Sequence, residues 1–161
     1  MGFKYTLLYV VLIVAVNYGF TVAPMVALPG GEMWPTISLV VGFIFVARDF
    51  SQREIGHKVI VAMLAAGAIS YLMAGPQVAV ASVAAFLLSE FADWAVYSFT
   101  RRPFSQRILL SSALGTPLDS IVFLAMIGHL SATGVLAMTL SKMLGALVVW
   151  LMVRRRETAP A

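Results

Sequence analysis

The stretch PTISLVVGFIFVARDFSQRE, residues 35–54, places the chain in a structural class. Apolar side chains fill it from Ile37 to Ala47 with few interruptions. A helix needs about 20 mostly apolar residues to cross a hydrocarbon core roughly 30 Å thick. The stretch therefore predicts a membrane-spanning helix, and it places Arg48 and Asp49 inside that helix.

Five further stretches on either side of it have the same character. Turn residues such as those at 29–31 and 101–103 separate them. We predict an all-α integral membrane protein with a bundle of six transmembrane helices in a single domain, residues 1–161. The expected spans are residues 5–23, 35–54, 58–74, 78–99, 108–130 and 132–153.

The composition agrees with a lipid environment. The chain is 61% hydrophobic and 11% charged, whereas a soluble domain has about 25% charged residues. Its mean hydropathy is +0.95. The absence of cysteine excludes disulfides and thiolate ligands. We expect the lipid bilayer to be the main partner of this multi-pass protein.

Positive charges predict the orientation, because cytoplasmic loops are enriched in Lys and Arg. In a six-span arrangement, none of the 11 basic residues falls in a loop on the outer side. Both termini are therefore expected in the cytoplasm. The formal charge of +4 could suggest nucleic acid as a partner, but the basic residues lie at span ends rather than in a patch, so we expect no nucleic-acid binding.

Six ionisable side chains lie within the predicted spans, where each costs several kcal/mol unless it is paired or faces a wet cavity. Asp119 and Lys142 lie about 15 Å into their spans, near the middle of the membrane. The other four are nearer the cytoplasm: Arg48, Asp49, Glu90 and Asp93. Glu90 and Asp93 share one helix face, and such close like charges favour a proton on one of them near neutral pH.

The fifth predicted span carries a narrow polar stripe, because Ser112, Gly115, Thr116 and Asp119 recur at spacings of three and four. Asn17 adds an amide to the first span. The charged residues could be structural ion pairs that hold helices together. Four acids against two bases nevertheless leave two surplus negative charges, which favours a ligand cavity over a packed core.

Catalytic and metal-binding motifs are absent from the sequence. It contains no phosphate-binding loop, no H-E-x-x-H helix and no G-x-S-x-G elbow, so we expect neither an enzyme nor a cofactor. His57 and His129 lie at opposite membrane boundaries, so we expect no shared metal site.

The ordered motifs resemble a known family. They are FIFVARD at 43–49 followed by Arg53 and Gly56, Glu90-x-x-Asp93 before Arg101-Arg102, SSALGTPLDS at 111–120, and Lys142 in the last span. Asn17-Tyr18 also fits. Together they are similar to the queuosine precursor transporter family, also called VUT, over nearly the whole chain.

The resemblance implies a six-helix inner-membrane protein, similar in fold to the substrate-binding subunits of vitamin uptake systems. It implies import of 7-cyano-7-deazaguanine or its aminomethyl relative. A carboxylate would accept from the two donors of the deazaguanine edge, Lys142 or Arg48 would meet its carbonyl, Asn17 another polar edge and Phe43 its flat face. The candidate substrate-binding residues are Asn17, Phe43, Arg48, Asp49, Glu90, Asp93, Ser112, Asp119 and Lys142.

Two alternatives remain open from the sequence. The chain could be a vitamin-binding membrane subunit that requires a separate ATP-driven module, docked on small faces such as Ala15-x-x-x-Gly19. It could also be a non-transporting assembly protein whose charges only pair its own helices. Homo-oligomerisation and an energising module are both left open as protein partners.

Overall fold

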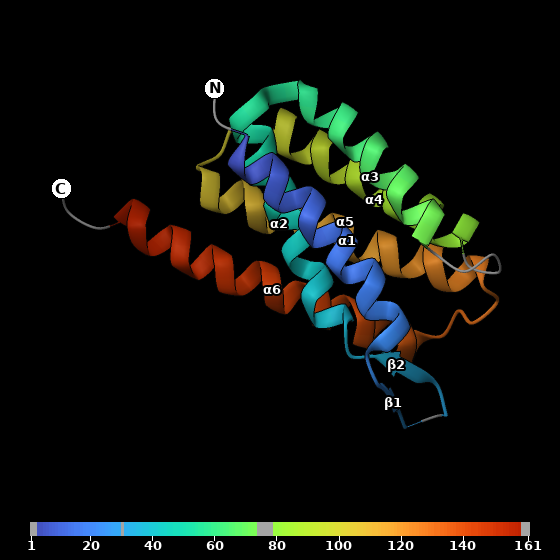
Figure 1. Cartoon of the computed structure of the whole chain (residues 1–161). Coiled ribbons are helices and arrows are strands. Elements are labelled where there is room, and N and C mark those ends of the chain that lie inside the picture. Colours follow the sequence, from blue (N-terminus) through green and yellow to red (C-terminus); the bar gives the residue numbers. More distant parts are fainter. Residues whose placement is uncertain (1–2, 30, 74–78, 159–161) are drawn as a thin grey trace.

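The computed structural model describes residues 3–29, 31–73 and 79–158. Within these residues the chain forms six α-helices (Figure 1). They are α1 (Lys4–Val22), α2 (Ser38–Ile55), α3 (Val59–Met73), α4 (Ala79–Phe99), α5 (Phe104–Met126) and α6 (Ala132–Thr158). The all-helical prediction is confirmed, and each predicted segment overlaps one helix.

Five helical runs of the described chain are long and apolar enough to cross a membrane. One run, Ser38–Met73, contains α2, a 3₁₀ turn (Gly56–Lys58) and α3. Gly56 adopts φ +63° in that turn, and the chain turns back there (Figure 1). The α1 start and the α6 end lie at the same end of the bundle (Figure 1). That the chain crosses the membrane six times, with both termini in the cytoplasm, stays a prediction.

The fifth predicted segment, residues 108–130, is displaced from the helix that forms. Helix α5 begins earlier, at Phe104, and ends at Met126. Gly128 ends it by adopting φ +74°, while the His129 amide donates to the Leu124 carbonyl at 2.9 Å. The left-handed glycine stops the helix although the apolar sequence continues. Helix α6 also extends past the predicted end at 153, through the arginines to Thr158.

The connection between α1 and α2 is a β-hairpin rather than a simple turn. Strand β1 (Met25–Ala27) pairs antiparallel with β2 (Met33–Pro35), with Val26 opposite Trp34. The hairpin lies at the end of the bundle opposite to the start of α1 (Figure 1). Our expectation of a turn missed it because both strands are only three residues long.

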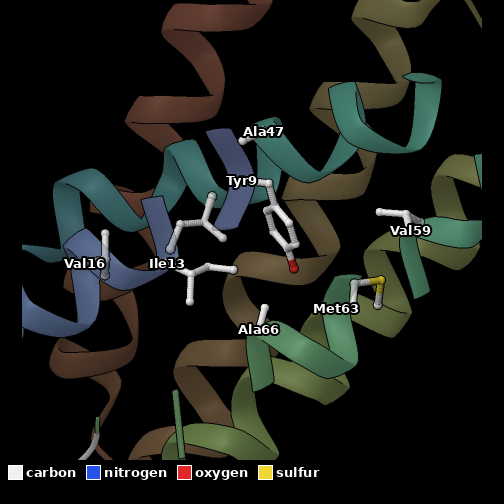
Figure 2. Close-up of a cluster of buried hydrophobic side chains, with 8 residues drawn as sticks. Tyr9, Ile13, Val16, Ala47, Val59, Met63 and Ala66 are labelled. Carbon is white, nitrogen blue, oxygen red and sulfur yellow. The ribbon is translucent and has the colours of Figure 1, made fainter. Parts of the chain in front are cut away.

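The apolar core lies where α1 packs on α2 and α3 (Figure 2). Tyr9, Ile13 and Val16 of α1 meet Met63 and Ala66 of α3, and all five are buried. Many large apolar side chains point outwards instead, including Leu72, which is 82% exposed. Such a surface fits lipid tails, which solvate apolar side chains as well as a protein core does.

Helices α2 and α6 cross at two glycines. A Cβ atom on Gly42 would lie 1.9 Å from the backbone oxygen of Lys142. A Cβ atom on Gly145 would lie 3.1 Å from the carbonyl carbon of Gly42. Small residues let helix backbones approach closely in membranes. This crossing fixes Lys142 against α2.

Two carboxylates cap neighbouring helices at the end of the bundle where α1 begins. Glu54, at the end of α2, accepts from the amides of Tyr5 and Thr6 at 3.1 and 3.0 Å. Glu157, at the end of α6, accepts from the amide and hydroxyl of Ser105 at 3.2 and 2.5 Å. Each returning helix thus satisfies orphan donors at the start of the helix beside it.

We predict that Gly42→Ala destabilises the protein, because the new methyl group would overlap backbone atoms that cannot move aside. Overpacking of this kind costs about 1–3 kcal/mol. Thermal unfolding of the purified protein in detergent measures the loss. Gly67→Ala is the matched control, since the nearest atom there belongs to the flexible Leu87 side chain at 3.1 Å. Equal melting temperatures for the two variants would contradict the tight crossing.

Candidate functional site

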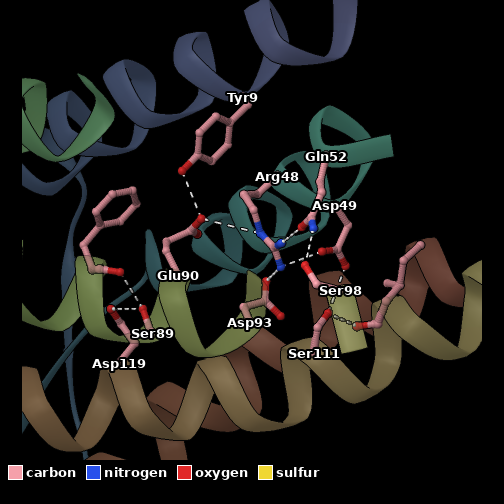
Figure 3. A network of polar contacts seen from close by, with 12 residues as sticks. Tyr9, Arg48, Asp49, Gln52, Ser89, Glu90, Asp93, Ser98, Ser111 and Asp119 are labelled. Carbon is pink, nitrogen blue, oxygen red and sulfur yellow. Dashed lines mark hydrogen bonds and ion pairs between the residues drawn. The ribbon is translucent and has the colours of Figure 1, made fainter. Parts of the chain in front are cut away.

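A buried arginine is the centre of the polar interior (Figure 3). Arg48 lies on α2 with its side chain fully buried, although it is one of the largest side chains in the protein. It pairs with Asp49 at 2.6 Å and with Asp93, and its Nε lies 3.7 Å from Glu90. All three carboxylates are also fully buried. We call these four residues the Arg48 cluster.

Neutral side chains from four helices complete the Arg48 cluster. The Tyr9 hydroxyl of α1 donates to Glu90 at 3.0 Å, and the Ser111 hydroxyl of α5 donates to Asp49 at 2.9 Å (Figure 3). Arg48 donates to Gln52 at 2.5 Å, and Gln52 in turn donates to Ser98 of α4 at 2.7 Å. The Arg48 cluster therefore ties α1, α2, α4 and α5 together.

The local sequence explains how the cluster fits. Glu90 and Asp93 are one turn apart on α4, so both face α2. Gly115 of α5 has no side chain, and a Cβ there would lie 3.4 Å from the Asp93 Cβ and 3.1 Å from the Phe45 ring. The glycine lets α5 pack directly against the charged face of α4.

A second group of polar residues adjoins the first and involves α6. Lys142 forms an ion pair with Asp119 of α5 and donates to the Ser120 hydroxyl at 3.0 Å. The Ser89 hydroxyl lies 3.4 Å from Asp119, and Ser89 precedes Glu90 on α4 (Figure 3). The Asp119 side chain is 16% exposed, whereas Lys142 is 1% exposed. We call Asp119 and Lys142 the Lys142 pair.

The structure brings together six of the nine predicted site residues. Arg48, Asp49, Glu90 and Asp93 form the first cluster, and Asp119 and Lys142 form the adjoining pair. These contacts are ion pairs between helices, which the sequence analysis considered as the alternative to a ligand cavity. It leaves the charge surplus in place, because two cations face four carboxylates.

The other three predicted residues lie apart from these ion pairs. Asn17 donates to Ser70 at 3.0 Å and to the Ile13 carbonyl at 2.8 Å, so it joins α1 to α3. Phe43 is half-buried beside the α2–α6 crossing, where its backbone nitrogen lies next to Gly145. Ser112 is fully buried, and its hydroxyl has no hydrogen-bond partner in the described structure.

Several neutral members of the site were not selected from the sequence: Tyr9, Gln52, Ser89 and Ser98. Gln52 follows Arg48 by one helical turn, a spacing that would have pointed to it. Tyr9 gave no such signal, because the buried positions that follow it on its face of α1, Ile13 and Val16, are apolar. Within the described residues, no group of three or more His, Asp or Glu side chains is arranged to hold a metal ion.

A family model described as "Putative vitamin uptake transporter" matches residues 2–154. The chain belongs to this family. Membership and the apolar helical runs together make the protein a multi-pass membrane transporter. The family assignment favours transport over catalysis. No curated protein and no solved structure matches the chain.

For this transporter we predict that Lys142 and Asp119 stabilise the fold only as a pair. Lys142→Met leaves a carboxylate without its counter-charge, and breaking a buried pair costs about 3–5 kcal/mol. The double variant Lys142→Met with Asp119→Leu should therefore unfold at a higher temperature than Lys142→Met alone. Thermal unfolding in detergent measures both.

Lys58→Met is the control for the loss of a lysine, because Lys58 is exposed on the 3₁₀ turn. It should leave the unfolding temperature nearly unchanged. If the double variant lost as much stability as Lys142→Met and Asp119→Leu lose together, the two side chains would not be coupled.

Proposed function

We propose that this transporter imports 7-cyano-7-deazaguanine, or a closely related deazapurine precursor of queuosine, across the inner membrane. One observation carries the proposal: the Lys142 pair places a carboxylate and an ammonium side by side, and its carboxylate is partly exposed. The motifs of the sequence, including SSALGTPLDS at 111–120, resemble the queuosine precursor family.

The chemistry of the Lys142 pair matches the edge of a deazaguanine. That edge has a ring N–H and an amino group next to each other, followed by a carbonyl. The two oxygens of Asp119 can accept from the two donors, while the Lys142 ammonium donates to the carbonyl. The ligand would replace the direct contact between Lys142 and Asp119 with hydrogen bonds to both.

Other predicted residues have secondary roles in this proposal. Phe43 lies at the same α2–α6 crossing as the Lys142 backbone, a level suited to contact with the flat face of the ligand. Ser112 offers a buried hydroxyl without a partner. Arg48 is already surrounded by carboxylates, so we assign the carbonyl contact to Lys142 rather than to Arg48.

The alternative within transport is a vitamin-binding subunit that depends on an ATP-driven module. The proposal predicts uptake by the purified chain alone in proteoliposomes. Uptake that appears only with a copurified ATPase would support the subunit instead. A non-transporting assembly protein would bind neither the deazapurine nor any of a panel of water-soluble vitamins.

We predict that Asp119→Asn lowers the initial uptake of labelled 7-cyano-7-deazaguanine at least about tenfold. The amide replaces one of two acceptors with a donor, and a hydrogen bond to a charged group contributes about 1.5–3 kcal/mol. Uptake is measured in proteoliposomes with matched amounts of protein.

Glu32→Gln is the matched control, because Glu32 lies in the turn between β1 and β2. It should transport like the parent protein. If folded Asp119→Asn protein transports at the parental rate, Asp119 is not part of the ligand site.

A further inference from the structure

The Arg48 cluster holds more negative charge than its cation can neutralise. One guanidinium faces the carboxyl groups of Asp49, Glu90 and Asp93, and all four side chains are fully buried. The adjoining Lys142 pair is balanced by itself, so it offers no spare positive charge. An uncompensated charge is strongly disfavoured in a low-dielectric interior.

Four carboxylate oxygens of this cluster have no hydrogen-bond partner in the described structure, and two of them, on Asp49 and Asp93, form ion pairs with Arg48 instead. The other two have neither kind of partner. They are Oε1 of Glu90 and Oδ1 of Asp93, each on a fully buried side chain. A protonated carboxyl group is a donor as well as an acceptor, and it carries no charge. A proton on one of these oxygens would therefore reduce the surplus charge, and protons on both would remove it, with the contacts to Arg48 left in place.

A proton suits this place better than a metal ion. Arg48 already occupies the centre of the carboxylates, where a metal cation would lie against a fixed positive charge. Within the described residues, no set of three acidic or histidine side chains has the arrangement of a metal site. The unpartnered oxygens accept a proton without displacing the guanidinium.

The cluster is also connected to the ligand position. The charged and titratable groups around Glu90 and Asp93 are Tyr9 on α1, Arg48 and Asp49 on α2, and Asp119 with Lys142 on α5 and α6. The ring of Tyr97 on α4 lies beside the Arg48 guanidinium. Ser89, beside Glu90, contacts Asp119 at 3.4 Å. A change in what Asp119 binds would therefore alter a contact of Ser89, the residue next to Glu90 on α4.

We propose that Glu90 and Asp93 form a proton-binding site around Arg48, and that a proton and the ligand bind together. The coupling of the proton to the ligand rests on the proposed function. The proton is taken up from water onto one carboxylate, and no other bond changes. Binding free energies are reciprocal, so a proton that favours the ligand is itself favoured by the ligand. Ligand affinity should then fall as the pH rises.

The first test needs no ligand. Infrared difference spectra of the purified protein between about pH 5 and 8 report the carbonyl band of protonated carboxyl groups. We expect such a band in the parent protein, weaker in Glu90→Gln and in Asp93→Asn, and unchanged in Glu32→Gln. Each amide removes surplus negative charge, so these variants should fold, and size-exclusion profiles will check this.

Two results would overturn the proton site in this test. One is a parent protein whose buried carboxyl groups all stay ionised over this range. The other is a band that keeps its full intensity in both Glu90→Gln and Asp93→Asn. Neither result depends on which ligand is transported, so failure here is distinguishable from failure of the proposed function.

The second test measures the linkage. In proteoliposomes, an inwardly directed proton gradient should accelerate 7-cyano-7-deazaguanine uptake by the parent protein and should have no effect on Glu90→Gln with Asp93→Asn. That double variant should still bind the deazapurine in detergent, with an affinity that no longer changes with pH. Gradient-driven accumulation by the double variant at the parental level, or a strict need for Na⁺, would overturn the linkage.

Discussion

The guanidinium of Arg48 is the counter-charge on which the interior of this protein depends. Three carboxylates on α2 and α4 surround it, and hydroxyl groups from α1 and α5 donate to two of them, Glu90 and Asp49. A cation buried this deeply cannot be left alone, so the helices that carry its partners are held in one register. Asp119, the proposed ligand contact, is connected to these helices through Ser89.

The helices could be predicted from the sequence because a membrane span imposes length and apolarity on each segment. What the pattern could not show was where a helix stops inside a continuing apolar run. Gly128 ends α5 through its left-handed backbone, while the predicted segment continued to Leu130. The β1–β2 hairpin was missed for a related reason, since short strands leave no periodic pattern.

The charged members of the site could be chosen because each ionisable side chain in a span needs a partner. The sequence could not determine which carboxylate meets which cation, because helix packing decides that. Ser111 rather than Ser112 bonds to Asp49, a difference of one residue that turns on the rotation of α5. Asn17 was chosen as an uncharged amide within a span, yet it joins α1 to α3 instead.

The two carboxylate caps have a mechanical consequence. Glu54 ties the end of α2 to the start of α1, and Glu157 ties the end of α6 to the start of α5. Each cap thus fastens one helix hairpin, α1 with α2 and α5 with α6, at the same end of the bundle. The two hairpins also pack on each other, through the backbone contact of Gly42 with Gly145 and through the buried side chains of Val46 and Ala146. Loss of either glutamate would therefore release the first turn of one helix without breaking the contacts between the two hairpins.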